Sequence, residues 1–298
     1  KSRVGGCVLG ILFALARTGS AVKLHRGNIE KVDKWCKDPA ADDINAWDVS
    51  GLKNMSHLFG GLDCVANFNH DIDSWDVAGV TNMSYMFRGD IEGASQFNQD
   101  LNSWDVQKVA DMSNMFSYAT NFNQDLNSWD VKNVADMKNM FRGISTKFNG
   151  NINDWDVASV TNMTGMFLSA TNFNRRLRSW DVKNVVGMRN MFRDATKFNG
   201  NINHWNVSSV NNMVLMFEGA TNFNRDLDSW DVSNVRSMQQ MFARAKAFNT
   251  PLENWRPKQD TKIDDMFRNT DLSGCNKRII HGAFENNGEF QLSYFNWG

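Results

Sequence analysis

Nine tryptophans recur along this chain at nearly constant intervals. They are Trp47, Trp75, Trp104, Trp129, Trp155, Trp180, Trp205, Trp230 and Trp255. Successive members lie 28, 29, 25, 26, 25, 25, 25 and 25 residues apart. A period of this length, sustained over most of a 298-residue chain, is the signature of a repeat protein whose units stack on their neighbours. The chain is therefore predicted to form one long array.

Each repeat unit carries the same apolar positions, and we call a set of equivalent positions a column. In the unit that begins at Trp104, the apolar positions are Val106, Val109, Met112, Met115, Phe116, Ala119, Phe122 and Leu126. The 16 methionines all fall in two columns, so the chain does not begin with methionine and we expect a processed or truncated product. We expect Met112, Met115, Phe116 and Phe122, with their equivalents, to be buried, and no unit to be stable alone.

The local pattern predicts one strand and one helical turn in each unit. Residues 122–129 alternate apolar and polar side chains, which indicates a short strand and the corner after it. The i, i+3, i+4 spacing of Met, Met and Phe indicates one or two helical turns. A capping residue often precedes the first Met, as at Asn54, Asn82, Asp111, Asp136, Asn162, Asn212 and Ser237. The predicted fold is an α/β solenoid, a leucine-rich-repeat-like stack of about nine 25-residue coils with parallel strands and helical caps at both ends.

An asparagine column supports stacking. The residue after the phenylalanine of each predicted strand is Asn69, Asn98, Asn123, Asn149, Asn174, Asn199, Asn224 or Asn249. A side chain repeated at one height of a stack can bond the backbone of the next coil and satisfy groups that would otherwise stay unpaired. The alternative is an asparagine array that binds a ligand. A ligand would contact a few coils and not all eight, so we favour a structural ladder.

An aspartate column follows the tryptophans. Its members are Asp48, Asp76, Asp105, Asp130, Asp156, Asp181 and Asp231, with Asn206 in the remaining unit. Like charges stacked about 5 Å apart repel by roughly 3 kcal/mol per pair at an effective dielectric constant of 20. We therefore expect each side chain to accept hydrogen bonds from its own turn. Calcium bound between adjacent coils is the secondary interpretation.

The repeated phrase FNQDLNSWDV-x-x-V-x-x-M-x-x-MF-x-x-A, at residues 97–119 and in its copies, resembles the BspA-like leucine-rich-repeat surface protein family. The resemblance covers residues 28–298. The segments Val32–Cys36 and Cys275–Ile280 are similar to the terminal caps of that family. The resemblance implies an extracellular or surface-exposed interaction module without assigned chemistry, and it names no ligand.

Four segments follow from these patterns. Residues 1–24 form a signal peptide or an N-terminal apolar helix, residues 25–46 an N-terminal cap, residues 47–270 the repeat and residues 271–298 a C-terminal cap. The first segment has Lys1 and Arg3 before a 13-residue apolar run, which resembles a secretory signal peptide and is too short to span a bilayer. The alternative is a helix retained in the mature protein. We expect a secreted or cell-surface location, or an organelle lumen, and no transmembrane span.

The four cysteines are too few for a disulfide scaffold. Cys36 and Cys64 both flank the first coil, so a bridge between them is predicted for a secreted protein; reduced core thiols are the alternative. Cys275 stands at the far end of the repeat. No cysteine or histidine spacing indicates zinc, so we expect no metal site of that kind.

Charge and motifs exclude several function classes. The formal net charge is −1, which gives no basic excess for a nucleic-acid partner. The mean hydropathy of −0.48 argues against a polytopic membrane protein. The five histidines are scattered, and no hydrolase, nucleotide-binding or dinucleotide-binding motif is present. We expect no enzyme activity and no cofactor.

Variation is concentrated after the ladder asparagines. Arg175, Arg176 and Arg178 interrupt an acidic trend there and are flanked along the repeat by Asp125 and Asp226. An ordinary solvated surface explains a single cluster; the functional interpretation is a partner site, because arginine pairs carboxylates bidentately. We expect a non-enzymatic module that binds a protein or glycan through its strand face. The alternatives are a structural subunit of a larger assembly and, ranked lower, a carbohydrate-active enzyme.

Overall fold

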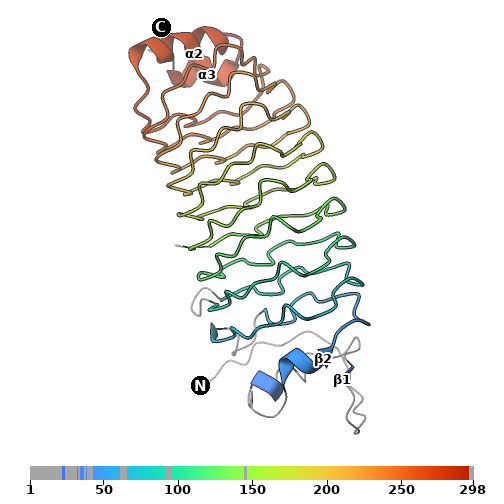
Figure 1. The fold of residues 1–298 in the computed structure, drawn as a ribbon. Helices are drawn as coiled ribbons and strands as arrows, with labels where there is room; N and C mark the ends of the chain where they lie inside the picture. Colours follow the sequence, from blue (N-terminus) through green and yellow to red (C-terminus); the bar gives the residue numbers. More distant parts are fainter. Residues whose placement is uncertain are drawn as a thin grey trace, which may run out of the picture.

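The computed structural model describes residues 22–23, 32, 34–36, 38, 43–60, 66–90, 95–143 and 146–294. Its regular elements are strand β1 (Val22–Lys23), 3-10 helix η1 (Ile44–Ala46), strand β2 (Trp47–Asp48), helix α2 (Gly274–Ala283) and helix α3 (Gly288–Tyr294). Strands β1 and β2 pair in parallel, with Val22 opposite Trp47. Between β2 and α2 the chain runs through stacked coils, with the two helices at one end (Figure 1).

Single parallel bridges join each coil to the next. They connect, in turn, Asn54, Asn82, Asp111, Asp136, Asn162, Gly187, Asn212, Ser237 and Lys262. These are the positions directly before the first Met of each unit, or before Ile263 in the last unit. The coils therefore stack in register, one repeat unit per step, as the constant period predicts.

The local structure of the coil differs from the predicted strand and helical turn. Residues 122–129 form no strand, and the bridge lies instead at the position predicted to cap a helix. The Met–Met–Phe segment contains two successive turns. The Met115 amide donates to the Met112 carbonyl at 3.2 Å, and Asn114 has a φ of +57°. A left-handed third residue is the mark of a type II turn rather than a helix.

The reason for these turns lies in the neighbouring coil. The amides of Met112, Asn114 and Phe116 donate to carbonyls of the next coil at 3.0, 2.8 and 2.9 Å. A helix would direct the same amides to carbonyls four residues back in their own coil. Alternate amides therefore bond between coils, and the amides between them close turns within the coil. Residues with a positive φ recur because the direction of the backbone amides must reverse within each turn to keep this alternation.

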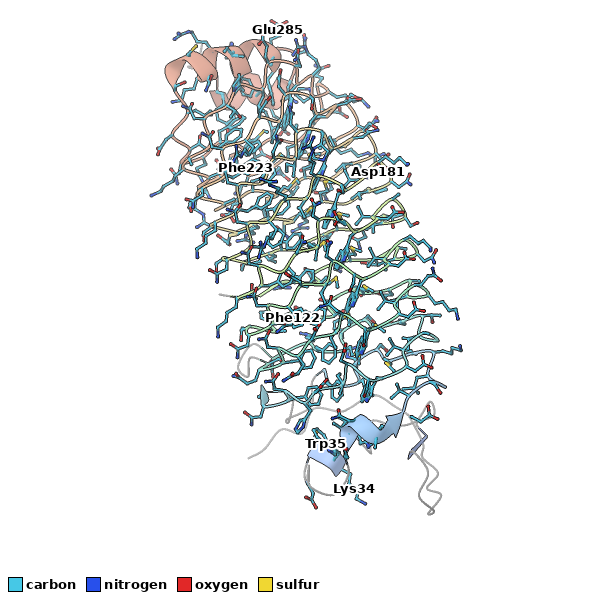
Figure 2. The ribbon with its side chains drawn as sticks, in the orientation of Figure 1. Lys34, Trp35, Phe122, Asp181, Phe223 and Glu285 are labelled. Atoms are coloured by element: carbon cyan, nitrogen blue, oxygen red, sulfur yellow. The ribbon has the colours of Figure 1, made fainter. Side chains whose placement is uncertain are left out.

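The core consists of columns of like side chains that continue from coil to coil. Met112, Met115, Phe116 and Phe122 are buried, as the repeat predicts. Figure 2 shows Phe122 and Phe223 inside the stack and Asp181 at its edge. Rings of neighbouring coils lie face to face; those of Trp129 and Trp155, for example, have centroids 6.4 Å apart and planes only 3° from parallel.

The tryptophan column also forms a hydrogen-bonded ladder, which we did not predict from the sequence. From Trp75 to Trp255 the indole Nε1 of each repeat tryptophan donates to a backbone carbonyl of the preceding coil, at 2.7 to 3.3 Å. For Trp155 the acceptor is the Leu126 carbonyl, at 2.7 Å. A buried indole N–H requires such a partner. Tryptophan thus fills the core and satisfies a buried carbonyl with one side chain.

The C-terminal helices cover the last coil, and α3 also accepts hydrogen bonds from its backbone amides. Glu289 of α3 accepts from the amide of Ile263 at 3.1 Å, and the Tyr294 hydroxyl accepts from the amide of Phe267 at 3.1 Å. In earlier coils the equivalent amides donate to the next coil. The ring of Phe284 stacks on Trp255, with centroids 6.3 Å apart. Both helices, α2 (Gly274–Ala283) and α3 (Gly288–Tyr294), lie within residues 271–298, the segment predicted to form a helical cap.

The N-terminal end is described in part. Residues 32 and 34–36 are helical, and Trp35 packs edge-on against Trp47 with centroids 6.3 Å apart. Of the predicted signal segment 1–24, only Val22 and Lys23 are described, and they pair with the first coil. Within the described residues, no helix has both the length and the apolarity needed to cross a membrane.

Removal of one core ring tests the predicted register. Phe167 is fully buried and stacks on Phe173 and Phe192, with centroids 4.0 and 5.4 Å away. We expect Phe167→Ala to lower the free energy of unfolding by about 3–5 kcal/mol, because it leaves a cavity in the column. Urea denaturation measures the loss, with the exposed Arg189→Ala as the control. A loss below about 1 kcal/mol would contradict the register.

Candidate binding groove beside the asparagine ladder

The asparagine column forms the predicted ladder. Each side-chain oxygen accepts the backbone amide of the asparagine in the next coil; from Asn199 to Asn174, for example, this distance is 2.9 Å. The other steps measure 2.7 to 3.0 Å. At the last step the Ser273 amide, just before α2, donates to Asn249 at 2.9 Å. The structural interpretation of this column is confirmed.

The column directly after the ladder asparagines contains long side chains that reach back to the preceding coil. The amide nitrogens of Gln99 and Gln124 donate to ladder carbonyls of the preceding coil, both at 2.8 Å. The Nε atoms of Arg175 and Arg225 make the same contact, at 2.5 Å to Asn149 and 2.8 Å to Asn199. Glutamine and arginine are therefore interchangeable in this bond, and arginine adds a charge.

A glycine separates the two arginines and opens a groove between them. Gly200 occupies this column between Arg175 and Arg225, and a Cβ atom there would lie 3.2 Å from the Arg175 carbonyl oxygen. An open groove of about 810 Å³ lies over this glycine. Its lining residues come from three successive coils: Asn174, Arg175, Arg176, Arg178, Asn199, Gly200, Asn201, Asn203, His204, Arg225 and Ser229.

The groove brings together all three arginines of the predicted site. Arg175, Arg176 and Arg178 are exposed, and none of them forms an ion pair within the described part of the chain. Sequence reasoning missed Arg225 and His204. The column shared by Arg175 and Arg225 was visible in the repeat, whereas the proximity of His204 depends on how adjacent coils stack.

The two predicted acidic partners lie outside this lining. Asp125 accepts the Asn151 amide at 2.6 Å, and Asp226 accepts the Asp228 amide at 2.9 Å. Asp226 also accepts from the Asn203 side chain at 3.2 Å, so it touches only the margin of the groove. Both carboxylates accept backbone amides, and neither pairs with an arginine within the described part of the chain. No acidic side chain lines the groove.

The aspartates after the tryptophans hold turns, as predicted. Each accepts the amide two residues ahead; from Asp156 to Ala158, for example, the distance is 3.1 Å. Asn206 does the same for Ser208 at 3.1 Å. A hydrogen bond from the Lys183 ammonium, at 2.7 Å, holds the pKa of Asp181 below its ordinary value. Among the described residues no cluster of histidine, cysteine and carboxylate side chains is suited to a metal ion.

A second arginine cluster is neutralised within the protein. Glu218 is only 4% exposed and accepts from Arg193 at 2.6 Å and from Arg244 at 2.7 Å. Arg244 also contacts Asp194 at 3.1 Å. Burial, together with the Glu218 carboxylate, raises the pKa of Asp194 above its ordinary value despite these arginines. This cluster ties three coils together and leaves no arginine charge unpaired, unlike the groove.

The cysteines are resolved in part. Cys36 is disulfide-bonded, and Cys275 is a free, exposed thiol. Cys64, the predicted partner of Cys36, lies outside the described residues, so the Cys36–Cys64 pairing stays a prediction.

Comparison with known proteins identifies a family. Three overlapping stretches, residues 28–147, 128–213 and 174–279, match the family described as "Mycoplasma protein of unknown function, DUF285". Together they cover most of the chain. No curated protein and no solved structure matches it.

The ladder bond can be tested at Asn199. Its side-chain oxygen accepts the Asn224 amide at 3.0 Å, and Ala would leave this donor without its protein partner. We expect Asn199→Ala to lower the free energy of unfolding by about 1 kcal/mol. Asn199→Asp retains the accepting oxygen and should cost less. Equal losses in urea denaturation would show that the oxygen is unimportant.

The buried cluster predicts a pH dependence. The pKa of Asp194 is raised in the folded state, so ionised Asp194 weakens the fold at neutral pH, and this penalty disappears as pH falls through the raised pKa. We therefore expect Asp194→Asn to raise the melting temperature at about pH 7 and to gain less at about pH 4.5. Asp181→Asn is the control with the opposite sign, because the pKa of Asp181 is lowered. A gain that is independent of pH would rule out this explanation.

Proposed function

This chain belongs to the DUF285 family, and we propose that it is a non-enzymatic, leucine-rich-repeat-like solenoid that binds a macromolecular partner, a protein or a glycan, through the arginine groove. The observation that carries the proposal is the groove itself. Four arginines from two coils line it with no carboxylate among them. Elsewhere the repeat pairs its buried charges, as it does around Glu218.

The rest of the repeat supports a binding role by contrast. The ladder asparagines, the aspartates after the tryptophans and the indole nitrogens are all committed to bonds within the stack. The charges of the groove arginines, in contrast, are not neutralised by any ion pair within the described part of the chain. Stacked repeats present surfaces of this kind to large partners.

The groove chemistry favours binding over catalysis. A glycosidase requires a pair of carboxyl groups on either side of the scissile bond. The groove lining contains one titratable histidine, His204, and no Asp or Glu. It is therefore better suited to hold an anionic or polar group than to transfer a proton between two carboxyls.

We place the protein at a cell surface or outside the cell. The resemblance to BspA-like surface proteins and the signal-peptide-like start of the sequence both motivate this location. The disulfide at Cys36 adds support, because disulfides persist mainly in oxidising compartments.

Affinity capture tests the proposal. The full chain and an Arg175→Ala, Arg176→Ala, Arg178→Ala variant are immobilised and exposed to an extract of the source cells. We expect the unmodified chain to retain a partner that the variant loses, because the variant removes three of the four groove arginines. Equal recovery by both would exclude the groove. Self-association with no partner would instead favour the structural-subunit alternative.

A further inference from the structure

We propose that the ligand of the arginine groove is an acidic polysaccharide, a carbohydrate chain that carries carboxylate or sulfate groups at regular intervals. This inference rests on the proposed function and specifies its partner. It follows from three properties of the groove: uncompensated charge, prepositioned guanidinium groups, and a lining without aliphatic, Phe, Tyr or Trp side chains.

The charge of the groove selects an anion. Arg175, Arg176, Arg178 and Arg225 contribute four positive charges. Within the described part of the chain these arginines form no ion pair. Asp226 accepts a hydrogen bond from the lining residue Asn203 at the margin of the groove. A ligand that fills the groove therefore supplies the missing negative charge.

Two of the guanidinium groups are held in place before a ligand arrives. The Nε atoms of Arg175 and Arg225 donate to ladder carbonyls, which fixes the stem of each side chain. A guanidinium has five N–H donors, so each retains four on its terminal nitrogens. These donors can bind a carboxylate or sulfate with two parallel hydrogen bonds. Because the side chains are already ordered, less conformational entropy is lost on binding.

The two fixed arginines are repeated along the stack. Arg175 and Arg225 occupy the same column two coils apart, with Gly200 between them. At the spacing of parallel strands this separates the two arginine backbones by roughly 10 Å. A polymer with regularly spaced anionic groups can meet both sites at once, whereas a single small anion can meet only one.

The remaining lining favours a carbohydrate over an acidic peptide. It consists of amide and hydroxyl side chains, Asn174, Asn199, Asn201, Asn203 and Ser229, which match the dense hydroxyl groups of a sugar. Protein interfaces are anchored near their centre by Trp and Tyr together with Arg. The groove has the arginines but no Phe, Tyr, Trp or aliphatic side chain, and the one strongly exposed large hydrophobic residue among those described, Val186, is not part of it.

The experiment uses four polymers as probes. Heparin provides sulfate groups, polygalacturonate provides carboxylates, dextran is the neutral sugar control, and poly-L-glutamate is the acidic peptide control. Binding of the full chain to each is measured by titration calorimetry at low salt. We expect binding to heparin and polygalacturonate that weakens as salt is added, no binding to dextran, and weaker binding to poly-L-glutamate.

The groove variant is built from the residues of the repeat itself. Arg175→Gln and Arg225→Gln restore the side chain that Gln99 and Gln124 use for the same carbonyl bond. Arg176→Asn and Arg178→Asn introduce the residues of other coils, such as Asn201 and Asn203. The combined variant therefore removes four charges without removing a ladder contact, and its unfolding curve verifies that it folds.

A matched variant removes four charges elsewhere. Lys53, Lys108, Lys138 and Arg189 are exposed, form no ion pair within the described part of the chain and do not line the groove. Each is changed to Gln. We expect the groove variant to bind the acidic glycans roughly tenfold or more weakly, and the matched variant to stay within about twofold of the unmodified chain.

The unfavourable outcomes separate the two proposals. Preferential binding of poly-L-glutamate that the groove variant abolishes would retain the groove and overturn the carbohydrate. Equal glycan binding by the groove and matched variants would show a diffuse charge effect and overturn the groove as the binding site. An unmodified chain that binds none of the charged probes would overturn the ligand class, while affinity capture would still decide the proposed function.

Discussion

The structure depends on the direction of its backbone amides. In the Met–Met–Phe segment of each coil, alternate amides leave their own coil and donate to carbonyls of the next. A coil with this pattern cannot be helical, and it leaves donors unpaired unless another coil or a cap follows. These amides all need partners, and this one requirement accounts for the residues with positive φ, the register of the stack and the hydrogen bonds that α3 accepts from the last coil.

Register explains why the repeat tolerates so little variation inside. Once successive coils are equivalent, a side chain at one height meets its own copy in the coils on either side. Phe116, for example, lies against Phe87 and Phe141 with ring centroids 5.5 and 5.7 Å away. A change of size in one coil would therefore disturb two neighbours. Asn and Trp persist because each bonds the adjacent coil as well as packing or capping its own.

The sequence varies more in the columns whose side chains lie on the outer surface of the stack. At the position after the ladder asparagine, Gln and Arg both supply the one N–H donor that the bond to the ladder carbonyl needs, whereas Gly makes no such bond and leaves the position open. Where two arginines flank a glycine, the same frame yields an open, positively charged groove. The contrast with the Arg193–Glu218–Arg244 cluster is instructive, since there the charges neutralise one another and tie coils together.

The sequence by itself determined which residues are equivalent. Its period identified the buried Met and Phe positions, the asparagine ladder and the turn-holding aspartates, because each depends on recurrence at a fixed interval. It identified the arginine cluster because that cluster departs from the recurring pattern. Only the tertiary structure decided the backbone conformation, because i, i+3, i+4 spacing suits a helix and a pair of turns alike. The choice between them is made by the carbonyls of the next coil, which no single unit contains. For the same reason the indole ladder, the α3 cap, the addition of Arg225 and His204 to the groove and the exclusion of Asp125 and Asp226 from its lining became visible only when the coils were stacked.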